Sequence, residues 1–233
     1  MSDTNSIVVC SYNIDAARRE QNSVHSELHF ENRAPRLLQN MLESKADILC
    51  LQELRNLDNC TLDVVATMHH VQRTTHLAAV GPFYYGQQDV SFALVTLYRR
   101  SRFAVENVGI IQLSPGQFDE HGKICLWTLF RCIATGRHFI VANTHFDVAP
   151  ESAKDEAIKQ CFPQLKELAT KNKCSVLCVG DYNLFDDLQG GNQRKTIESM
   201  GFTDIFFPLH LDDSQSAPVL SGTFKGYSKT DKQ

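Results

Sequence analysis

Six short apolar runs divide the chain, and they limit its fold more than any other feature. Each run is rich in β-branched or aromatic residues and is bounded by polar turns, the pattern of a buried β-strand. The runs are Ile7–Ile14, Asp47–Leu54, Ser91–Tyr98, Ile124–Ile133, Phe139–Phe146 and Val176–Val179. Weaker candidates are Ala104–Leu113 and Phe202–Phe207. The stretch from about 81 to 135 carries strand signals without a convincing helix, which predicts a β-meander.

Helical signals lie on both sides of that meander. Asn32 is placed to cap a first helix, with Pro35 in the first turn. The apolar positions of this helix are Leu37, Leu38, Met41 and Leu42. A short last helix is expected over Gln193–Met200, with Gly201 as its C-terminal stop.

A longer helix precedes the last of the six runs. Ser152 and Asp155 have capping-box spacing, and an apolar stripe at helical spacing follows them. The stripe consists of Ile158, Cys161, Phe162, Leu165 and Leu168. Pro163 removes one backbone donor and should kink or split this helix. Central strands with helices at both ends predict an α+β fold, a four-layer sandwich of two packed mixed β-sheets flanked by helices.

Length and charge narrow the possible functions. The 233 residues show no repeat, low-complexity tract or flexible linker, so we expect one domain over residues 1–233. The net charge of −4 provides no strong positive field for holding duplex nucleic acid, although a local basic patch can still exist. No apolar run approaches the roughly 20 residues that a transmembrane helix needs.

The eight cysteines indicate a reducing environment. Cys10, Cys50 and Cys178 lie inside strand-like runs, where cysteine acts as a small buried apolar residue. The sequence contains no Cys-x-x-Cys pair, and its first residues are polar without a secretory apolar segment. We therefore expect reduced thiols in an intracellular protein, most simply a cytoplasmic one.

Polar side chains follow four of the predicted buried strands. Asn13, Glu53 and His145 each lie near the C-terminal end of one run, and Asp181 and Asn183 follow another. Because burying such groups unpaired is costly, their repeated position at strand ends suggests a shared polar site at one edge of the sandwich. Ordinary strand ends, with an Asx-type turn at the last of them, explain the same pattern, and the residues alone leave both interpretations open.

Taken in order, the motifs of the chain resemble those of the endonuclease/exonuclease/phosphatase superfamily, the metal-dependent phosphoesterases that share the pancreatic-type deoxyribonuclease fold. The motifs are Ser11–Ile14, Asp47–Glu53, Tyr98–Phe103, Asn143–Phe146, Gly180–Asn183, Gly201–Asp204 and Gly222–Tyr227. They follow the family's order over residues 8–227. The spacing around Trp127 and Asn143 is most similar to the subgroup described only as general hydrolases of this family.

The resemblance implies a divalent cation, usually Mg²⁺ with Mn²⁺ as the alternative, and a role for each polar strand end. Glu53 would be the carboxylate ligand, and Asn13 would ligate the ion directly or through water. His145 would hydrogen-bond a phosphate oxygen in the transition state. Asp181 would orient or deprotonate the attacking water or support the leaving group, with Asn183 holding the phosphate beside it.

Substrate contacts are less well marked. Arg99, Arg100 and Lys123 are candidates for contacts with substrate phosphates. The expected partner is a phosphoester: a nucleic-acid end, a nucleotide, an inositol phosphate or a phospholipid headgroup. The negative net charge favours a small phosphoester or a single-strand end over duplex DNA.

One departure from the family pattern concerns the C-terminal region. Such enzymes end with an adjacent Asp-His pair on a final strand, whereas the last histidine here, His210, lies in a different context. The chain is therefore expected to be short of the last strands. Two interpretations of the chain follow. It is a catalytically impaired binding or regulatory member of the fold, or it is a portion of an ordinary enzyme.

Overall fold

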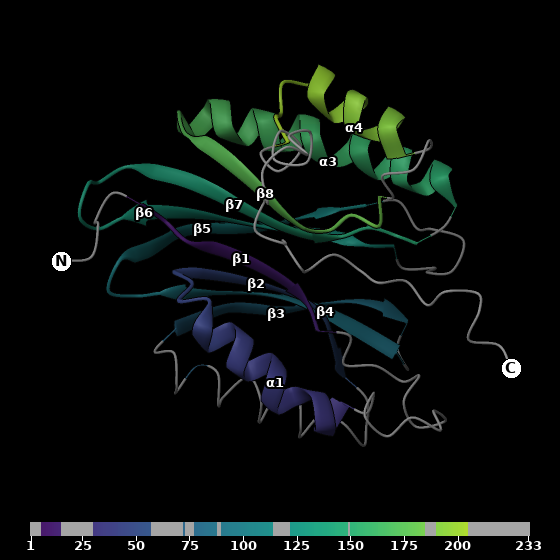
Figure 1. Cartoon of the computed structure of the whole chain (residues 1–233). Coiled ribbons are helices and arrows are strands. Elements are labelled where there is room, and N and C mark those ends of the chain that lie inside the picture. Colours follow the sequence, from purple (N-terminus) through teal and green to yellow (C-terminus); the bar gives the residue numbers. More distant parts are fainter. Residues whose placement is uncertain are drawn as a thin grey trace, which may run out of the picture.

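A computed structural model of the chain describes residues 6–14, 30–56, 72, 77–87, 90–113, 122–148, 150–184 and 190–204. Two four-stranded mixed sheets pack face to face, and helices cover the outer face of each sheet (Figure 1). The predicted α+β sandwich is confirmed. Of the weaker candidate at 202–207, residues 202–204 are not in a strand and 205–207 lie outside the described residues. The motif at 222–227 also lies outside them.

The first sheet has a parallel pair at one edge. In spatial order its strands are β1 (Val9–Asn13), β2 (Ile48–Asn56), β4 (Val90–Arg99) and β3 (Leu77–Gln87). β1 pairs with β2 in parallel, and the other pairs are antiparallel. Helix α1 (Phe30–Glu43) covers the outer face, where buried Met41 packs with Leu51 and Val95.

The second sheet has its parallel pair at the opposite end of its strand order. The strands are β5 (Phe103–Gln112), β6 (Ile124–Cys132), β7 (His138–His145) and β8 (Ser175–Asp181). Among the described strands of this sheet, β7 and β8 pair in parallel and the other pairs are antiparallel. Helices α3 (Glu151–Asn172) and α4 (Gly190–Ser199) form the outer layer, and Phe162 of α3 packs in one buried cluster with Phe146.

Aromatic side chains fill much of the space between the sheets. The ring centroid of Phe130 lies 5.3 Å from that of Tyr98 on the facing sheet and 5.6 Å from that of Phe139. Phe130 and its neighbour Phe103 are at most 1% exposed. Full burial of such a side chain contributes about 1.5–3 kcal/mol each, so this layer fixes how the two sheets face each other.

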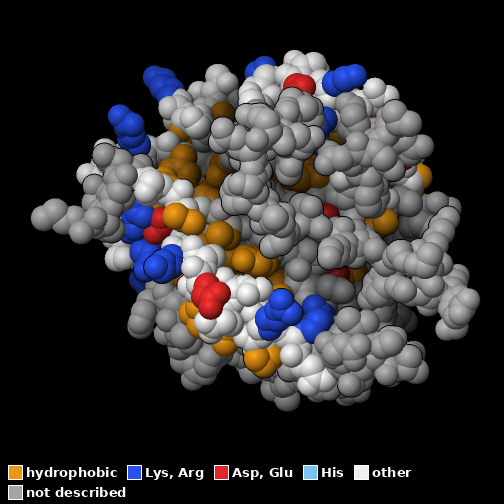
Figure 2. All heavy atoms as spheres, viewed as in Figure 1, with side chains coloured by type: hydrophobic (Ala, Val, Ile, Leu, Met, Phe, Trp, Pro, Cys, Tyr) orange, Lys and Arg blue, Asp and Glu red, His pale blue; other side chains and the backbone are white. Residues whose placement is uncertain are grey.

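Strands β1 and β8 lie beside each other although they are far apart in the sequence (Figure 1). Each is the end strand of its sheet among the described residues, and each is half of a parallel pair. Figure 2 shows apolar side chains in a band across this face, with Lys and Arg side chains around it. Ile7 and Val8, just before β1, are 40% and 42% exposed. Because β1 contacts β8 and each is half of a parallel pair, the carboxyl ends of β1, β2, β7 and β8 come together at one edge of the sandwich.

Strand β3 was not among the individual runs named from the sequence, although its residues from 81 onward lie in the predicted β-meander. Gly81 and Pro82 lie within the strand, where its register with β4 shifts between Val80 and Phe83. Because β3 is an edge strand in the described sheet, it tolerates a residue that cannot donate to a neighbour.

Two predicted helix starts and one predicted break were wrong. Helix α1 begins at Phe30, so Asn32 lies within its first turn rather than at its cap, and Pro35 is inside the helix. Helix α3 has Pro150 at its N-cap, not Ser152. It also continues through Pro163 to Asn172, because buried positions on both sides of the proline hold the helix against the second sheet. The stop at Gly201 is confirmed by its φ of +93°.

Two further features of the described residues concern the cysteines and the helices. The seven cysteines within the described residues are free, and Cys50, Cys125, Cys132 and Cys161 are buried. Among the described residues, no helix has both the length and the apolar character needed to cross a membrane.

Candidate active site at the carboxyl ends of four strands

Asn13 joins two acidic side chains from different sheets. Its Nδ2 donates to Glu53 Oε1 at 2.9 Å and to Asp181 Oδ2 at 2.9 Å. The parallel registers explain this meeting, because Asn13 pairs with Gln52 beside Glu53, and the strand end that carries Asp181 lies beside β1. Two carboxylates thus share one neutral donor, an arrangement that favours a cation nearby.

A bulge in β2 aims Glu53 into this cluster. The register between β2 and β4 shifts between Leu51 and Leu54, so two residues of β2 oppose one of β4. Glu53 has a left-handed backbone with φ of +57°. A bulge turns side chains away from the regular pleat, and a non-glycine residue in this conformation costs on the order of 1 kcal/mol. Such cost at a carboxylate that meets other polar groups is typical of a functional site.

His145, on β7, is uncharged and completes a cluster that consists of Asn13, Glu53, His145 and Asp181. Its Nε2 lies 3.5 Å from Glu53 Oε1, and the residue is only 3% exposed. Burial, followed by the positive charge of Lys123, holds the pKa of His145 well below its usual value of 6.5. At neutral pH the imidazole is therefore uncharged, with one N–H donor and one acceptor nitrogen.

Gly180 and Asn183 shape the turn that carries Asp181. Gly180 has φ of +144°, and a Cβ atom added to it would collide with the carbonyl oxygen of Thr144 on β7. The Asn183 backbone N–H donates to Asp181 Oδ1 at 3.0 Å, and its Nδ2 donates to Phe146 O at 2.9 Å. The turn is thus an Asx-type turn, and the other oxygen of the same carboxylate reaches Asn13.

Of the three candidate phosphate contacts, the structure brings only Lys123 to this end. Lys123 directly precedes β6, whose Cys125 pairs with Thr144 beside His145. Its Nζ lies 5.2 Å from the ring centroid of Phe92, and its charge acts on His145.

Arg99 and Arg100 are a correction to the predicted site, because they lie at the opposite end of the first sheet. β4 runs antiparallel to β2, so Arg99 meets Asp47 at the start of β2, about 20 Å along the strand from Glu53. Arg99 Nε donates to Asp47 Oδ1 at 3.2 Å, and Arg100 is exposed in the following turn. Neither side chain joins the cluster.

The donor atoms of the cluster are those that a magnesium ion prefers. Within the part of the chain that the structure describes, no three His, Cys, Asp or Glu side chains form a ready metal-binding group. Mg²⁺ sites commonly use one or two carboxylates and keep several water ligands. The converging oxygens of Glu53 and Asp181, with the Asn13 amide between them, fit that kind of open site.

Sequence reasoning assigned no role to two buried amides beneath the cluster. Gln52 Nε2 donates to Asn143 Oδ1 at 2.7 Å, and the two residues are 1% and 0% exposed. Both belong to motifs recognised in the sequence, Asp47–Glu53 and Asn143–Phe146. A polar amide inside an apolar run is the signal that could have singled them out.

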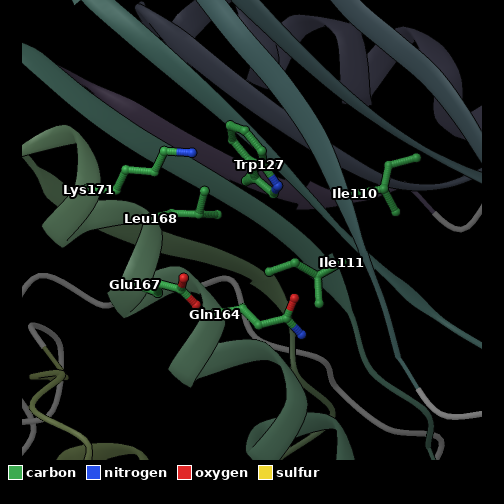
Figure 3. A pocket seen from close by; sticks show the side chains of 7 residues that line it. All are labelled: Ile110, Ile111, Trp127, Gln164, Glu167, Leu168 and Lys171. Carbon is green, nitrogen blue, oxygen red and sulfur yellow. The ribbon is translucent and has the colours of Figure 1, made fainter.

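A separate groove lies between α3 and the edge strand β5 (Figure 3). It has a volume of about 260 Å³, and Trp127, Glu167 and Lys171 are among its lining residues. None of the cluster residues lines it, so the groove is not part of the candidate active site.

Comparisons with known proteins agree with this fold. The catalytic domain of human Nocturnin with bound sulfate matches with a TM-score of 0.68 and 20% identity, over 91% of this chain and 76% of that chain. The Bacteroides thetaiotaomicron mannosyl-6-phosphatase matches with a TM-score of 0.60 and 21% identity, over 81% and 69%. ANGEL2, a 2',3'-cyclic phosphatase in complex with adenosine-2',3'-vanadate, matches with a TM-score of 0.59 and 19% identity, over 77% and 54%.

Sequence comparisons give the family directly. Curated protein sequences gave no significant match. The sequence model described as Endonuclease/Exonuclease/phosphatase family matches residues 10–230, nearly the whole chain. With four strand ends that gather the expected side chains and structural neighbours of the same fold, the chain belongs to the endonuclease/exonuclease/phosphatase family.

Proposed function

We propose that the protein is a divalent-metal-dependent phosphoester hydrolase, in which water attacks phosphorus in line with the leaving group. The observation that carries the proposal is the convergence of Asn13, Glu53, His145 and Asp181 from four strands of two sheets. Related folds act on phosphate esters, as the names mannosyl-6-phosphatase and 2',3'-cyclic phosphatase state. The two sheets hold these groups on rigid elements, which phosphoryl transfer requires.

Glu53 and Asn13 would hold the cation, with Mg²⁺ as the first choice and Mn²⁺ as the second. Glu53 would supply a carboxylate oxygen, a hard ligand. Asn13 would supply its amide oxygen after its side chain turns over, because its Nδ2 faces both carboxylates in this structure. A bound ion would polarise a phosphoryl oxygen and offset the charge that develops on it.

His145 acts as a neutral hydrogen-bond donor. Its lowered pKa keeps one ring nitrogen protonated and the other free near pH 7. Since the ring lies next to Glu53, its N–H can meet a phosphoryl oxygen near the cation. A preorganised donor of this type contributes about 10²–10³ in rate.

Asp181 serves the attacking water. One oxygen is fixed by the Asn183 N–H, and the other points to Asn13, so the carboxylate is held in one orientation. It orients the water and accepts its proton. The Asn183 amide, which donates to Phe146 O, would hold the phosphate through its second N–H. Lys123 adds positive charge at the same end and attracts the substrate.

The substrate is expected to be a small phosphoester or a single-strand nucleic-acid end. Because the net charge is −4, a phosphate must be attracted by local positive groups and not by the protein as a whole. Lys123 and the bound cation would supply the local positive charge that attracts the phosphate.

The proposal is tested by hydrolysis of a bis-aryl phosphate with Mg²⁺ or Mn²⁺, followed by EDTA. We expect turnover that EDTA abolishes and that Glu53→Gln lowers by at least about 100-fold. Glu106→Gln is the matched control, because Glu106 is a partly exposed glutamate on β5 that pairs with Arg131. Turnover that survives EDTA contradicts the proposal. Absence of turnover with intact ion binding supports instead a binding or regulatory member of the fold.

A further inference from the structure

The buried amides of Gln52 and Asn143 connect the two sheets one layer beneath the candidate active site. Asn143 belongs to β7 in the second sheet, and Gln52 belongs to β2 in the first. The Gln52 amide also donates to Ser11 Oγ on β1 at 3.0 Å. Three of the strands that carry the cluster are thus linked by side-chain hydrogen bonds.

Asn143 meets β2 and β4 at the bulge. Its Nδ2 donates to Leu51 O at 3.2 Å and to Val95 O at 3.0 Å. Leu51 and Val95 are the last regular pair before the register shift that precedes Leu54. The amide from the facing sheet therefore binds both strands where the bulge begins.

Each amide is close along the chain to a residue of the cluster. Asn143 lies two residues before His145, so the two side chains leave β7 on the same face. Gln52 directly precedes Glu53, whose left-handed backbone lies within the bulge. The bridge thus ties the backbone that aims Glu53 to the strand that carries His145.

We propose that Asn143 is a positioning residue, which fixes the bulge of β2 and thereby holds the Glu53 carboxylate beside His145. This inference rests on the function proposed above. Asn143 touches no reacting atom, because it lies beneath the cluster with 0% exposure. Its effect on the reaction passes through the place and direction of Glu53.

The bridge requires the particular chemistry of asparagine. Two N–H bonds go to two backbone carbonyls, while one oxygen accepts from Gln52. A leucine of similar shape supplies neither, an aspartate would put an acceptor against two carbonyl oxygens, and a serine supplies a single donor.

The test combines kinetics with a crystal structure of Asn143→Leu. We expect kcat on the bis-aryl phosphate to fall about 10²-fold while KM changes less than about twofold, because misplacing a group by about 1 Å has that effect. In the crystal structure, Glu53 should leave its left-handed backbone and separate from His145. Thr96→Val is the matched control, since Thr96 is also fully buried between the sheets. It should change neither quantity.

A double variant separates positioning from general destabilisation. If Asn143 acts through Glu53, Asn143→Leu adds no further loss of kcat to Glu53→Gln. Multiplied losses overturn the proposal. If Asn143→Leu does not fold, Asn143→Ser keeps one donor and should give a loss of about tenfold.

The crystal structure is informative even if the protein hydrolyses no phosphoester. A relaxed bulge in the Asn143 variant then supports the positioning role, while the missing turnover contradicts the proposed function. An unchanged bulge with Glu53 at its original place overturns the positioning role, whatever the activity.

Discussion

The two ends of the sandwich both hold acidic side chains, but these side chains have different partners and different burial. At the end of the sandwich that holds Arg99 and Arg102, here called the arginine end, Asp47 is 4% exposed. It accepts from these two arginines and from the Val8 backbone. At the opposite end, here called the Asn13 end, Glu53 and Asp181 share the neutral amide of Asn13. A carboxylate paired with two guanidinium groups is stabilising, whereas two carboxylates gathered around one amide favour a cation and chemistry.

The largest expected effect is on activity, at the Asn13 end. Asp181→Asn removes the group that accepts a proton from water, while the amide keeps a similar shape. Turnover of the bis-aryl phosphate should fall by about 10²–10³, with the melting temperature within a few degrees of the wild type. A variant that is folded and retains full turnover removes Asp181 from the mechanism.

The next effect is on stability, at the arginine end. Asp47→Asn leaves Arg99 and Arg102 without their carboxylate, and urea unfolding should show a loss of about 2–3 kcal/mol. Turnover per folded molecule should stay unchanged, because Asp47 is about 20 Å along β2 from Glu53. Lowered kcat in fully folded Asp47→Asn would break the distinction between the two ends.

A smaller effect concerns pH. The folded state lowers the pKa of His145, so the unfolded chain binds a proton more readily than the folded chain. Stability from this group is complete above its usual value of 6.5 and decreases as the pH falls from there toward the lowered folded value. Between pH 7.5 and 5.5 the loss should be about 1 kcal/mol, measured by urea unfolding. His145→Gln should remove this difference, and an identical pH dependence in that variant would contradict it.

The smallest effect is expected at Arg100. Arg100→Gln should change turnover by less than twofold, because its exposed side chain lies at the arginine end. Lys123→Gln is the comparison at the Asn13 end, with an expected loss of about tenfold in kcat/KM. Equal losses in the two variants would show that the ends are not distinct in substrate attraction.

The gathering of the main site residues could be predicted from the sequence. Asn13, Glu53, His145 and Asp181 each end a buried run, and the carboxyl ends of parallel strands meet at the same edge of a sheet. The motif order added the expectation of a common site. The runs do not show whether neighbouring strands pair in parallel or antiparallel. Arg99 also ends a strand, but β4 is antiparallel to β2 and carries it to the other end.

The remaining differences depend on tertiary contacts. The bulge at Glu53 and the bridge from Asn143 join residues that are far apart in the sequence, so no local pattern encodes them. Pro163 is similar, because burial of α3 against the second sheet outweighs the lost backbone donor. At Pro163, packing overrides the local signal.

The central claim is that the Asn13 end, and not the arginine end, holds a divalent cation. Calorimetric titration of Mn²⁺ into the wild type, Glu53→Gln and Asp47→Asn tests it directly. We expect the wild type and Asp47→Asn to bind the ion alike, and Glu53→Gln to bind it at least about tenfold more weakly. Equal binding by the wild type and Glu53→Gln would contradict the claim.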